Sequence, residues 1–443
     1  MKVSQESVIK IIKLGFGVIV KILSLIAGIY ILRWLNNNLT PNELQSFNLI
    51  QFFSGIFLFL TGFGLGPILT RIYTIENNKK KFFEFWATTN VIQIFLMLIG
   101  VLLILLIPKS ISNVNAELIL FMFLGQSAYA IDSHYKGFTD VNNSSWQFLI
   151  TDLSTKILFI AGLFYVSKNN TFGTSQLSIF GSNYTLNTNA MFWYLLLFFV
   201  LAVLQFCFDF LIQRKKLQIL KPNFSLLKEY RNEILSLTYI SVVVALSANT
   251  DRLFLKYFGY SEYVFNGYIN IYKLLDLTFI LEGIIIPVLF ANLIRGKNLE
   301  GSWWSFCKKS LWFWLIIGTG LVSSIGFIVG SYIVLPIIDP KRLYIQYSQD
   351  VMYFFALILL SNSTNFFISM ALFYKKKVYI DTIAITIYAI LSLILYSTLI
   401  KPYGHYGAAI STLIGSYFLI TFKLVYLKFI DNKINIAKLF QNK

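Results

Sequence analysis

The sequence predicts an all-α integral membrane protein with about twelve transmembrane helices. Hydrophobic residues make up 57% of the 443-residue chain and charged residues only 13%, whereas a soluble domain carries about 25% charged residues. The apolar residues gather in stretches of about 20, the length that crosses the hydrocarbon of a bilayer. The 43 Phe and 26 Tyr suit contact with lipid and the aromatic belts at its interfaces.

The expected helices form two sets of six. The first set covers residues 14–32, 48–72, 91–107, 117–135, 148–166 and 191–213. The second set covers residues 234–258, 268–293, 311–335, 351–374, 380–400 and 408–427. The first apolar stretch is long enough to span and lacks a small-residue cleavage site, so we expect it to remain as a helix.

Lys and Arg predict the orientation of these spans. They concentrate in the connections on the side of the N-terminus, with runs at 79–81, 214–216 and 375–377. Far fewer lie on the opposite side: Lys109, Lys168, Lys256, Lys341, Arg342 and Lys401. Both termini are therefore expected in the cytoplasm, with the chain in a bacterial cytoplasmic (inner) membrane. The net charge of +17 then reflects loops against anionic lipid, and no soluble domain remains to bind nucleic acid.

The longest cytoplasmic connection divides the chain into two halves. We expect an N-terminal six-helix bundle at 1–213, a cytoplasmic linker at 214–233, a C-terminal six-helix bundle at 234–427 and a cytoplasmic tail at 428–443. A weak repeat supports two like halves: PNELQSFN (41–48) and SEYVFNGY (261–268) each precede a second helix, and each is followed by a proline, Pro67 or Pro287. Halves that start on the same side are arranged as parallel repeats; two unrelated proline kinks are the alternative.

Two segments resemble polysaccharide exporters. LTGFGLGPILTR (60–71) resembles their second-helix signature, and NTDRLFLKYFGYSEYVFNGYINIYKL (249–274) resembles their seventh-to-eighth helix segment. The chain is thus similar to the Wzx-type O-antigen and capsular polysaccharide flippases, in the polysaccharide transporter family of the MOP superfamily. Lys256-Tyr257-Phe258 is bulkier than the small turn usual in that family.

This resemblance implies a MATE-like fold of two bundles around a central cavity. It implies a flippase, not an enzyme, that moves undecaprenyl-pyrophosphate-linked oligosaccharide repeat units to the periplasmic leaflet for O-antigen, lipopolysaccharide or capsule synthesis. The expected partners are this lipid-linked oligosaccharide, membrane lipids, and the polymerase and chain-length proteins of the same pathway. The sequence contains no Walker A motif and no spacing typical of a metal site, so we expect no cofactor apart from a coupling H⁺ or Na⁺.

Charged groups inside spans indicate the candidate site, because each costs about 2.5–3.5 kcal/mol at mid-helix on insertion scales. For pyrophosphate and sugar we predict Lys21, Arg71, Arg252, Lys273, Arg33 and Asn249. For ion coupling we predict Asp251, Asp276 and Glu282. Structural alternatives remain: Lys21 could snorkel to headgroups, Arg33 and Arg71 could anchor the interface, and Lys273 could pair with Asp276.

For the other polar groups in the spans, the sequence offers structural explanations. Asp152 and Lys156 are four residues apart, which favours a satisfied internal pair. Asp209 has no close partner in its helix and is expected to pair across helices. Asn365 could bind sugar hydroxyls or could bond to a neighbouring helix.

Three other functions are alternatives to the flippase. A MATE-type drug/cation antiporter would share the fold but would favour an acidic cavity, whereas here basic residues in the spans are at least as many as acids. A lipid II flippase usually has further C-terminal helices. A membrane polysaccharide polymerase would be expected to show a large periplasmic loop, and the longest here, 168–190, is short.

Overall fold

The computed structural model describes residues 5–62, 68–69, 72, 78–106, 116–141, 145–168, 173–179, 182–188, 190–213, 220–294, 311–374 and 377–427. The chain divides into two compact units, Met1–Val242 and Val243–Lys443. We describe each unit by itself.

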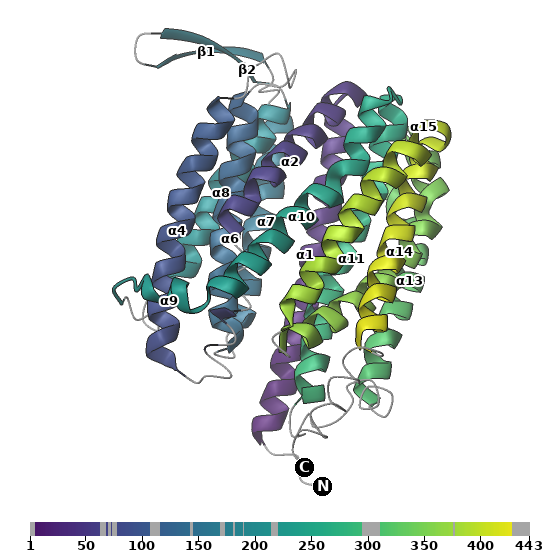
Figure 1. The fold of residues 1–443 in the computed structure, drawn as a ribbon. Helices are drawn as coiled ribbons and strands as arrows, with labels where there is room; N and C mark the ends of the chain where they lie inside the picture. The colour runs from purple at the N-terminus through teal and green to yellow at the C-terminus, as the bar shows by residue number, and fades with distance from the viewer. Residues whose placement is uncertain are drawn as a thin grey trace, which may run out of the picture. The chain divides into compact units, whose positions relative to one another are not determined.

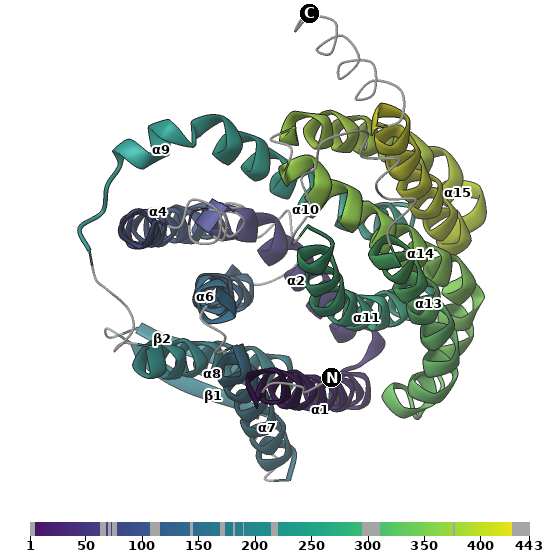
Figure 2. The same ribbon diagram turned by 90° about the horizontal axis from the view of Figure 1, so that it is seen from below.

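The first unit is a bundle of long helices arranged around α6 (Figure 1). Its helices are α1 (Gln5–Asn38), α2 (Pro41–Gly62), α4 (Lys79–Leu105), α6 (Ala116–Val141), α7 (Ser145–Lys168) and α8 (Ala190–Gln213), followed by the short α9 (Ser225–Glu229). Helix α6 packs against α2, α4, α7 and α8, while α1 packs along α7. The end-on view shows α6 among these neighbours (Figure 2).

A β-hairpin joins α7 to α8, within the connection expected as the longest periplasmic loop. Strands β1 (Gly173–Ile179) and β2 (Ser182–Thr188) pair antiparallel, with Gly173 opposite Thr188 and Ile179 opposite Ser182. The hairpin lies beyond the ends of the two helices (Figure 1). It adds two short strands to an otherwise helical structure.

In the second unit, α14 holds the central position. The unit contains the C-terminal part of α10 (Arg231–Tyr257), then α11 (Glu262–Ile294), α13 (Leu311–Ile338), α14 (Ile345–Tyr374) and α15 (Val378–Val425). Helix α14 packs against α11, α13 and α15, as the end-on view shows (Figure 2). Helix α15 consists of two arms that meet at a kink at Gly404.

The predicted spans all overlap these helices, and spans 380–400 and 408–427 are the two arms of α15. Within the described part, seven helices are long and apolar enough to cross a membrane. Helix α13 carries an outward apolar stripe in which Val322 is 71% exposed, Ile325 63% and Val329 55%. Lipid, rather than water, is the solvent that suits such a stripe on a helix whose backbone is fully hydrogen-bonded. The chain is a multi-pass membrane protein.

Two helices begin several residues before the apolar spans predicted from the sequence, because polar residues cap their first turns. At the start of α2, the Thr40 backbone N–H donates to Glu43 Oε2 at 2.9 Å and the Glu43 N–H donates to Thr40 Oγ1 at 3.3 Å, a capping box. The Val264 N–H likewise donates to Ser261 Oγ at 3.4 Å at the start of α11. The two repeat segments are thus equivalent helix starts, the second long helix of each unit.

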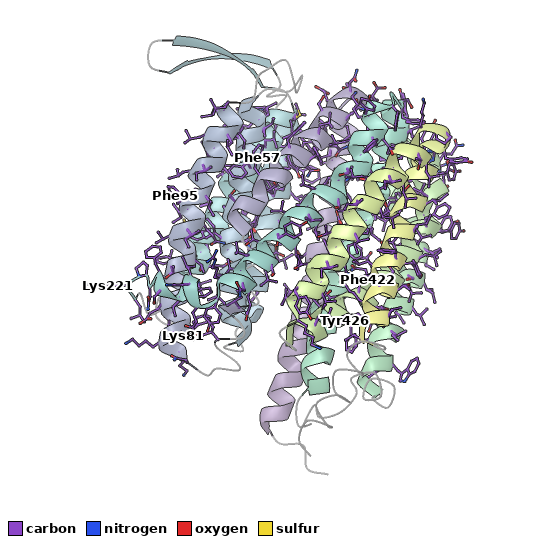
Figure 3. All side chains as sticks on the ribbon, in the orientation of Figure 1. Phe57, Lys81, Phe95, Lys221, Phe422 and Tyr426 are labelled. Carbon is purple, nitrogen blue, oxygen red and sulfur yellow. The ribbon has the colours of Figure 1, made fainter. Side chains whose placement is uncertain are left out.

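The described part of the expected linker is bound to α4. The Asn223 N–H donates to Thr88 Oγ1 at 2.7 Å, and Asn223 Nδ2 donates to Glu84 Oε2 at 3.0 Å. Lys81 pairs with Glu229 at 2.6 Å. Apolar residues of α4, α9 and the start of α10 form a buried cluster beside these bonds. Figure 3 shows Lys81 and Lys221 at this end of α4.

The kink in α15 depends on two glycines. Gly404 has φ 58° and ψ −131°, a conformation that favours glycine. The Tyr260 hydroxyl donates to the Ile400 and Lys401 carbonyls at 2.9 and 3.0 Å, groups near the kink that a straight helix would bond within itself. A Cβ added at Gly407 would lie 2.1 Å from the Leu399 carbonyl oxygen, so the second arm folds back too closely for any side chain there.

We therefore expect Gly407→Ala to lower the stability of the protein by at least about 1–3 kcal/mol, the usual cost of overpacking. The matched control is Gly326→Ala in α13, where an added Cβ meets no atom within 4 Å and alanine favours the helix. Thermal unfolding of both variants in detergent measures the difference. A Gly407→Ala variant as stable as the wild type would show that the kink does not need this close approach.

Candidate functional site

In the second unit, a cluster of charged and aromatic groups lies where α10 and α11 meet. Arg252 extends from the last turns of α10 and stacks on Tyr272 of α11, with Cζ 4.1 Å from the ring centroid. Its terminal Nη1 donates to Asn249 Oδ1 at 2.8 Å, and among the described residues its Nε has no hydrogen-bond partner. The guanidinium is thus held against an aromatic ring, its Nε has no protein partner among the described residues, and its planar fork of donors suits the oxygens of a phosphate group.

Asp251 anchors the buried side of this cluster. The carboxylate is 1% exposed, and it accepts from the Tyr268 hydroxyl at 2.5 Å and from the Arg252 backbone N–H at 2.8 Å. Tyr268 is fully buried and lies with Tyr272 against Phe355 of α14, each ring centroid 5.5 Å from that of Phe355. The carboxylate and the two rings fix the position from which Arg252 projects.

Lys273 and Asp276 of α11 complete the cluster. Asp276 is exposed, and Lys273 and Arg252 are half-buried. Lys273 directly follows Tyr272, the ring under the Arg252 guanidinium, and Asp276 lies one turn further along α11. Asp251 is enclosed by its hydrogen bonds. The charges that remain accessible are the positive charges of Arg252 and Lys273 and the negative charge of Asp276. This accessible face favours an anion.

Five residues predicted for binding or coupling lie on these two helix segments: hydrogen bonds join Asn249, Asp251 and Arg252, and Lys273 and Asp276 follow Tyr272 on α11. Their roles stay predictions. Arg71, and the side chains of Lys21 and Glu282, lie outside the described residues.

Arg33 lies elsewhere, in the first unit. It is exposed and lines a pocket of about 490 Å³ between the ends of α1 and α7. Trp34 lines the same pocket and donates from Nε1 to Ser167 Oγ at 2.8 Å. Aromatic rings, amides and one guanidinium surround this pocket, a mixture found in ligand sites.

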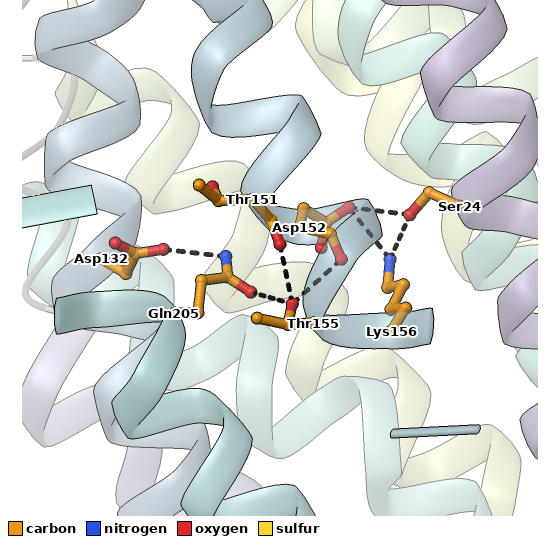
Figure 4. A network of polar contacts seen from close by, with 7 residues as sticks. All are labelled: Ser24, Asp132, Thr151, Asp152, Thr155, Lys156 and Gln205. Carbon is orange, nitrogen blue, oxygen red and sulfur yellow. Dashed lines mark hydrogen bonds and ion pairs between the residues drawn. The ribbon is translucent and has the colours of Figure 1, made fainter. Parts of the chain in front are cut away.

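A second polar network crosses the first unit (Figure 4). Lys156 Nζ pairs with Asp152 Oδ2 at 3.1 Å and donates to Ser24 Oγ at 2.5 Å, while Ser24 donates to Asp152 at 2.7 Å. The predicted pairing of Asp152 with Lys156 is confirmed. Thr155 donates to Gln205 Oε1 at 2.8 Å, and Gln205 in turn donates to Asp132 at 3.0 Å. The network ties α1, α6, α7 and α8 together through buried and half-buried side chains.

A third network, in the second unit, surrounds a lysine in the last predicted span, 408–427. Lys423 of α15 is completely buried and pairs with Asp381 at the start of the same helix. It also donates to Asn365 Oδ1 at 2.7 Å and to Ser369 Oγ at 2.9 Å. Asn365 thus bonds to a neighbouring helix, which is one of the two roles that the sequence predicted for it. All three ammonium donors of Lys423 have partners, so its role is structural.

Sequence reasoning missed Tyr268 and Tyr272. Their spacing could have identified them, because residues 268, 272 and 276 follow one another at four-residue steps and share one face of α11. The Lys423–Asp381 pair had no such signal, because its two members lie on different arms of α15.

No protein-family model matches the sequence, and no curated protein matches it. Solved structures that are similar along nearly the whole chain are transporters. The lipid II flippase MurJ in an inward closed conformation has a TM-score of 0.58 and 16% identity, covering 98% of this chain and 91% of that chain. An outward-facing multidrug resistance MATE family transporter of the MOP superfamily has a TM-score of 0.63 and 15% identity, covering 97% of both chains.

A MOP superfamily transporter from Pyrococcus furiosus, described as having a binding pocket of reverse polarity, has a TM-score of 0.63 and 14% identity. It covers 97% of this chain and 94% of that chain. These likenesses show a shared fold. The predicted MATE-like membrane fold is confirmed, and the chain has the fold of MOP-superfamily transporters.

Proposed function

We propose that the protein is a flippase that moves an undecaprenyl-pyrophosphate-linked oligosaccharide repeat unit across the bacterial cytoplasmic membrane by alternating access. The observation that carries this proposal is the half-buried Arg252 guanidinium, which lies over Tyr272 with Cζ 4.1 Å from the ring centroid, while the next residue of α11, Lys273, adds a second positive charge. Two facts support the proposal: the group lies on two long helices, α10 and α11, and the chain has the fold of membrane transporters. An anionic head group is the ligand for which such a site is suited.

The physical need for such a site follows from the substrate. A pyrophosphate-sugar head cannot enter hydrocarbon unaided, since burying an unpaired charge costs many kcal/mol. Arg252 would bind phosphate oxygens through charge-assisted hydrogen bonds, and Lys273 would add a second positive charge. Asn249 and the aromatic groups would contact the sugar or its linkage. That one similar structure is named a lipid II flippase supports a lipid-linked substrate for this fold.

The remaining parts of the proposal come from the sequence. Both termini would lie in the cytoplasm, and substrate would pass from the cytoplasmic to the periplasmic leaflet. Transport would be coupled to an H⁺ or Na⁺ gradient, with Asp251, Asp276 and Glu282 as candidate groups. Polymerase and chain-length proteins of the same pathway would act on the exported units, as in O-antigen and lipopolysaccharide synthesis.

Deleting the gene in a strain that makes surface polysaccharide tests the function. We expect lipid-linked repeat units to accumulate in the cytoplasmic leaflet and surface polymer to be lost, and plasmid-borne wild-type protein to restore both. Leaflet-resolved labelling of the repeat units measures the result. If the units reach the periplasmic leaflet normally in the deletion strain, with no second flippase encoded, the proposal is overturned.

A drug/cation antiporter of the MATE type is the second candidate. It is favoured by the first unit, where the polar network of the described residues includes three acids, Asp132, Asp152 and Asp209, and one lysine, Lys156. Such a protein would export cationic compounds. Raised sensitivity of the deletion strain to cationic dyes, with unchanged surface polysaccharide, would support this function over the flippase.

A further inference from the structure

The pocket that Arg33 lines, between the ends of α1 and α7, has a fixed floor. Trp34 is buried, and the bond from its Nε1 to Ser167 Oγ joins the two helices at 2.8 Å. Asn38 Nδ2 donates to the Trp34 carbonyl at 2.8 Å, and the Leu163 side chain of α7 is buried beneath the pocket. These contacts hold the cavity of about 490 Å³ open in a defined shape, as in a preformed ligand site.

The charges at the mouth of this pocket are positive. Arg33 is exposed and has no ion-pair partner among the described residues. It is the only charged residue of segment 22–42, and Lys168, which is also exposed, is the only charged residue of segment 157–189. The first acid after α1 is Glu43, whose carboxylate is bonded within the cap of α2. An anion at the pocket would therefore meet two cations and no acid from the segments that line it.

Exposed apolar side chains lead away from the pocket along both helices. On α1, Ile26 and Tyr30 are exposed, and steps of four and three residues place them on the face of Arg33. On α7, Ile157 and Phe164 are exposed and lie two turns apart on one face. Tyr30 and Phe164 also line the pocket. Each helix thus carries an apolar stripe that ends at the pocket.

Side-chain hydrogen bonds keep the two stripes next to each other. Ser24 of α1 donates to Asp152 of α7 at 2.7 Å, and Trp34 of α1 donates to Ser167 of α7 at 2.8 Å. One of these bonds lies at each end of the stripes, and α1 packs along α7 between them. The pocket and the apolar surface beside it therefore form one continuous feature of the first unit.

This combination suits an amphiphile with a phosphate group. A soluble anion would use the Arg33 guanidinium but would leave the apolar stripes uncovered, and an uncharged lipid would leave the guanidinium without a counter-charge. A phospholipid uses both, because its phosphate accepts charge-assisted hydrogen bonds and its acyl chain covers apolar surface. Aromatic side chains such as Tyr30 gather at the level of lipid headgroups. The absence of acids on the lining segments favours a lipid with a net negative charge.

We propose that this pocket binds the headgroup of an anionic phospholipid from the surrounding bilayer. Arg33 would bind the phosphate, and an acyl chain would lie along the stripes of α1 and α7. This lipid would hold the ends of the two helices together, in addition to the bond between Trp34 and Ser167. The site belongs to the first unit, whereas the cluster around Arg252 belongs to the second, and it does not rest on the proposed function.

Native mass spectrometry of the purified full-length protein tests the site. The probes are dioleoyl-phosphatidylglycerol, which is anionic, and dioleoyl-phosphatidylcholine, which has the same chains and no net charge. We expect the wild type to bind the anionic lipid more tightly, and Arg33→Ala to bind it about tenfold more weakly or worse. Lys256→Ala removes an exposed cation outside the pocket and should bind like the wild type.

Crosslinking locates the bound lipid. A phosphatidylglycerol with a photoreactive group in its acyl chain should label the peptides of α1 and α7 that contain Ile26 and Ile157, and Arg33→Ala should lose this label. Arg33 is exposed, so the variant should fold, which size-exclusion profiles and thermal unfolding check. If it does not fold, Arg33→Gln removes the charge and keeps most of the side chain.

Four results would overturn the phospholipid site. The first is equal affinity of the wild type and the folded Arg33 variant for phosphatidylglycerol, and the second is labelling confined to other helices. The third is displacement of the lipid by inorganic phosphate alone, which would make the pocket a site for soluble anions. The fourth is its displacement by an equimolar amount of undecaprenyl pyrophosphate, which would assign the pocket to the transported lipid.

Discussion

Replacing Arg252 by Ala is expected to lower the translocation of lipid-linked repeat units by about tenfold or more at an unchanged protein level. A hydrogen bond to a charged group contributes about 1.5–3 kcal/mol, and 1.4 kcal/mol corresponds to a factor of ten. Arg252→Lys should recover only part of the activity, since an ammonium group has the charge but lacks the planar fork. Leaflet-resolved labelling in the complemented deletion strain measures each variant.

The control for Arg252 lies one turn along the same helix. Lys256 is exposed in the last turn of α10, and Lys256→Ala removes the same charge from the chain outside the cluster. We expect this variant to translocate like the wild type. Equal activity of Arg252→Ala and Lys256→Ala would remove Arg252 from the substrate site, while a wild-type melting temperature of Arg252→Ala would show that its defect is not a loss of folding.

Replacing Asp381 by Ala is expected to destabilise the second unit by about 3–5 kcal/mol, because it leaves the Lys423 ammonium fully buried without its counter-charge. Asn365 and Ser369 would still accept from Lys423, but neither carries a negative charge. Thermal unfolding and the yield of folded protein in detergent measure the loss. The pair of Lys80 and Glu84, 3.9 Å apart with Lys80 exposed, is the control, and Lys80→Ala should change stability by less than about 1 kcal/mol.

A double variant separates charge from packing in this network. Asp381→Ala combined with Lys423→Met removes both charges and keeps much of the lysine volume. We expect it to recover most of the stability lost in Asp381→Ala, because a buried ion pair can be replaced by apolar residues at little cost. A double variant as unstable as the single one would mean that the loss comes from packing around Asp381.

The candidate site could be predicted from the sequence only in part. Asn249, Asp251, Arg252, Lys273 and Asp276 could be named because charged residues in apolar spans are rare and costly. Their ranking could not be predicted, since in the sequence Asp251 and Asp276 are both carboxylates in a span. The packing of Tyr268 encloses Asp251 and leaves Asp276 exposed. Burial of a side chain depends on which helix faces it, and neighbours along the chain do not determine that.

Hydropathy and the positions of Lys and Arg are properties of each segment of the chain, so predictions from them do not require knowledge of how the helices pack. From them alone the sequence determined a multi-pass helical membrane chain with helices at the positions observed, and it predicted an orientation. The tertiary structure alone decided which buried charges are neutralised and by what. Lys423 pairs with Asp381, and Asp132 accepts a hydrogen bond from Gln205. These pairs join helices or helix arms that are distant along the chain, and only folding brings their atoms within hydrogen-bonding distance.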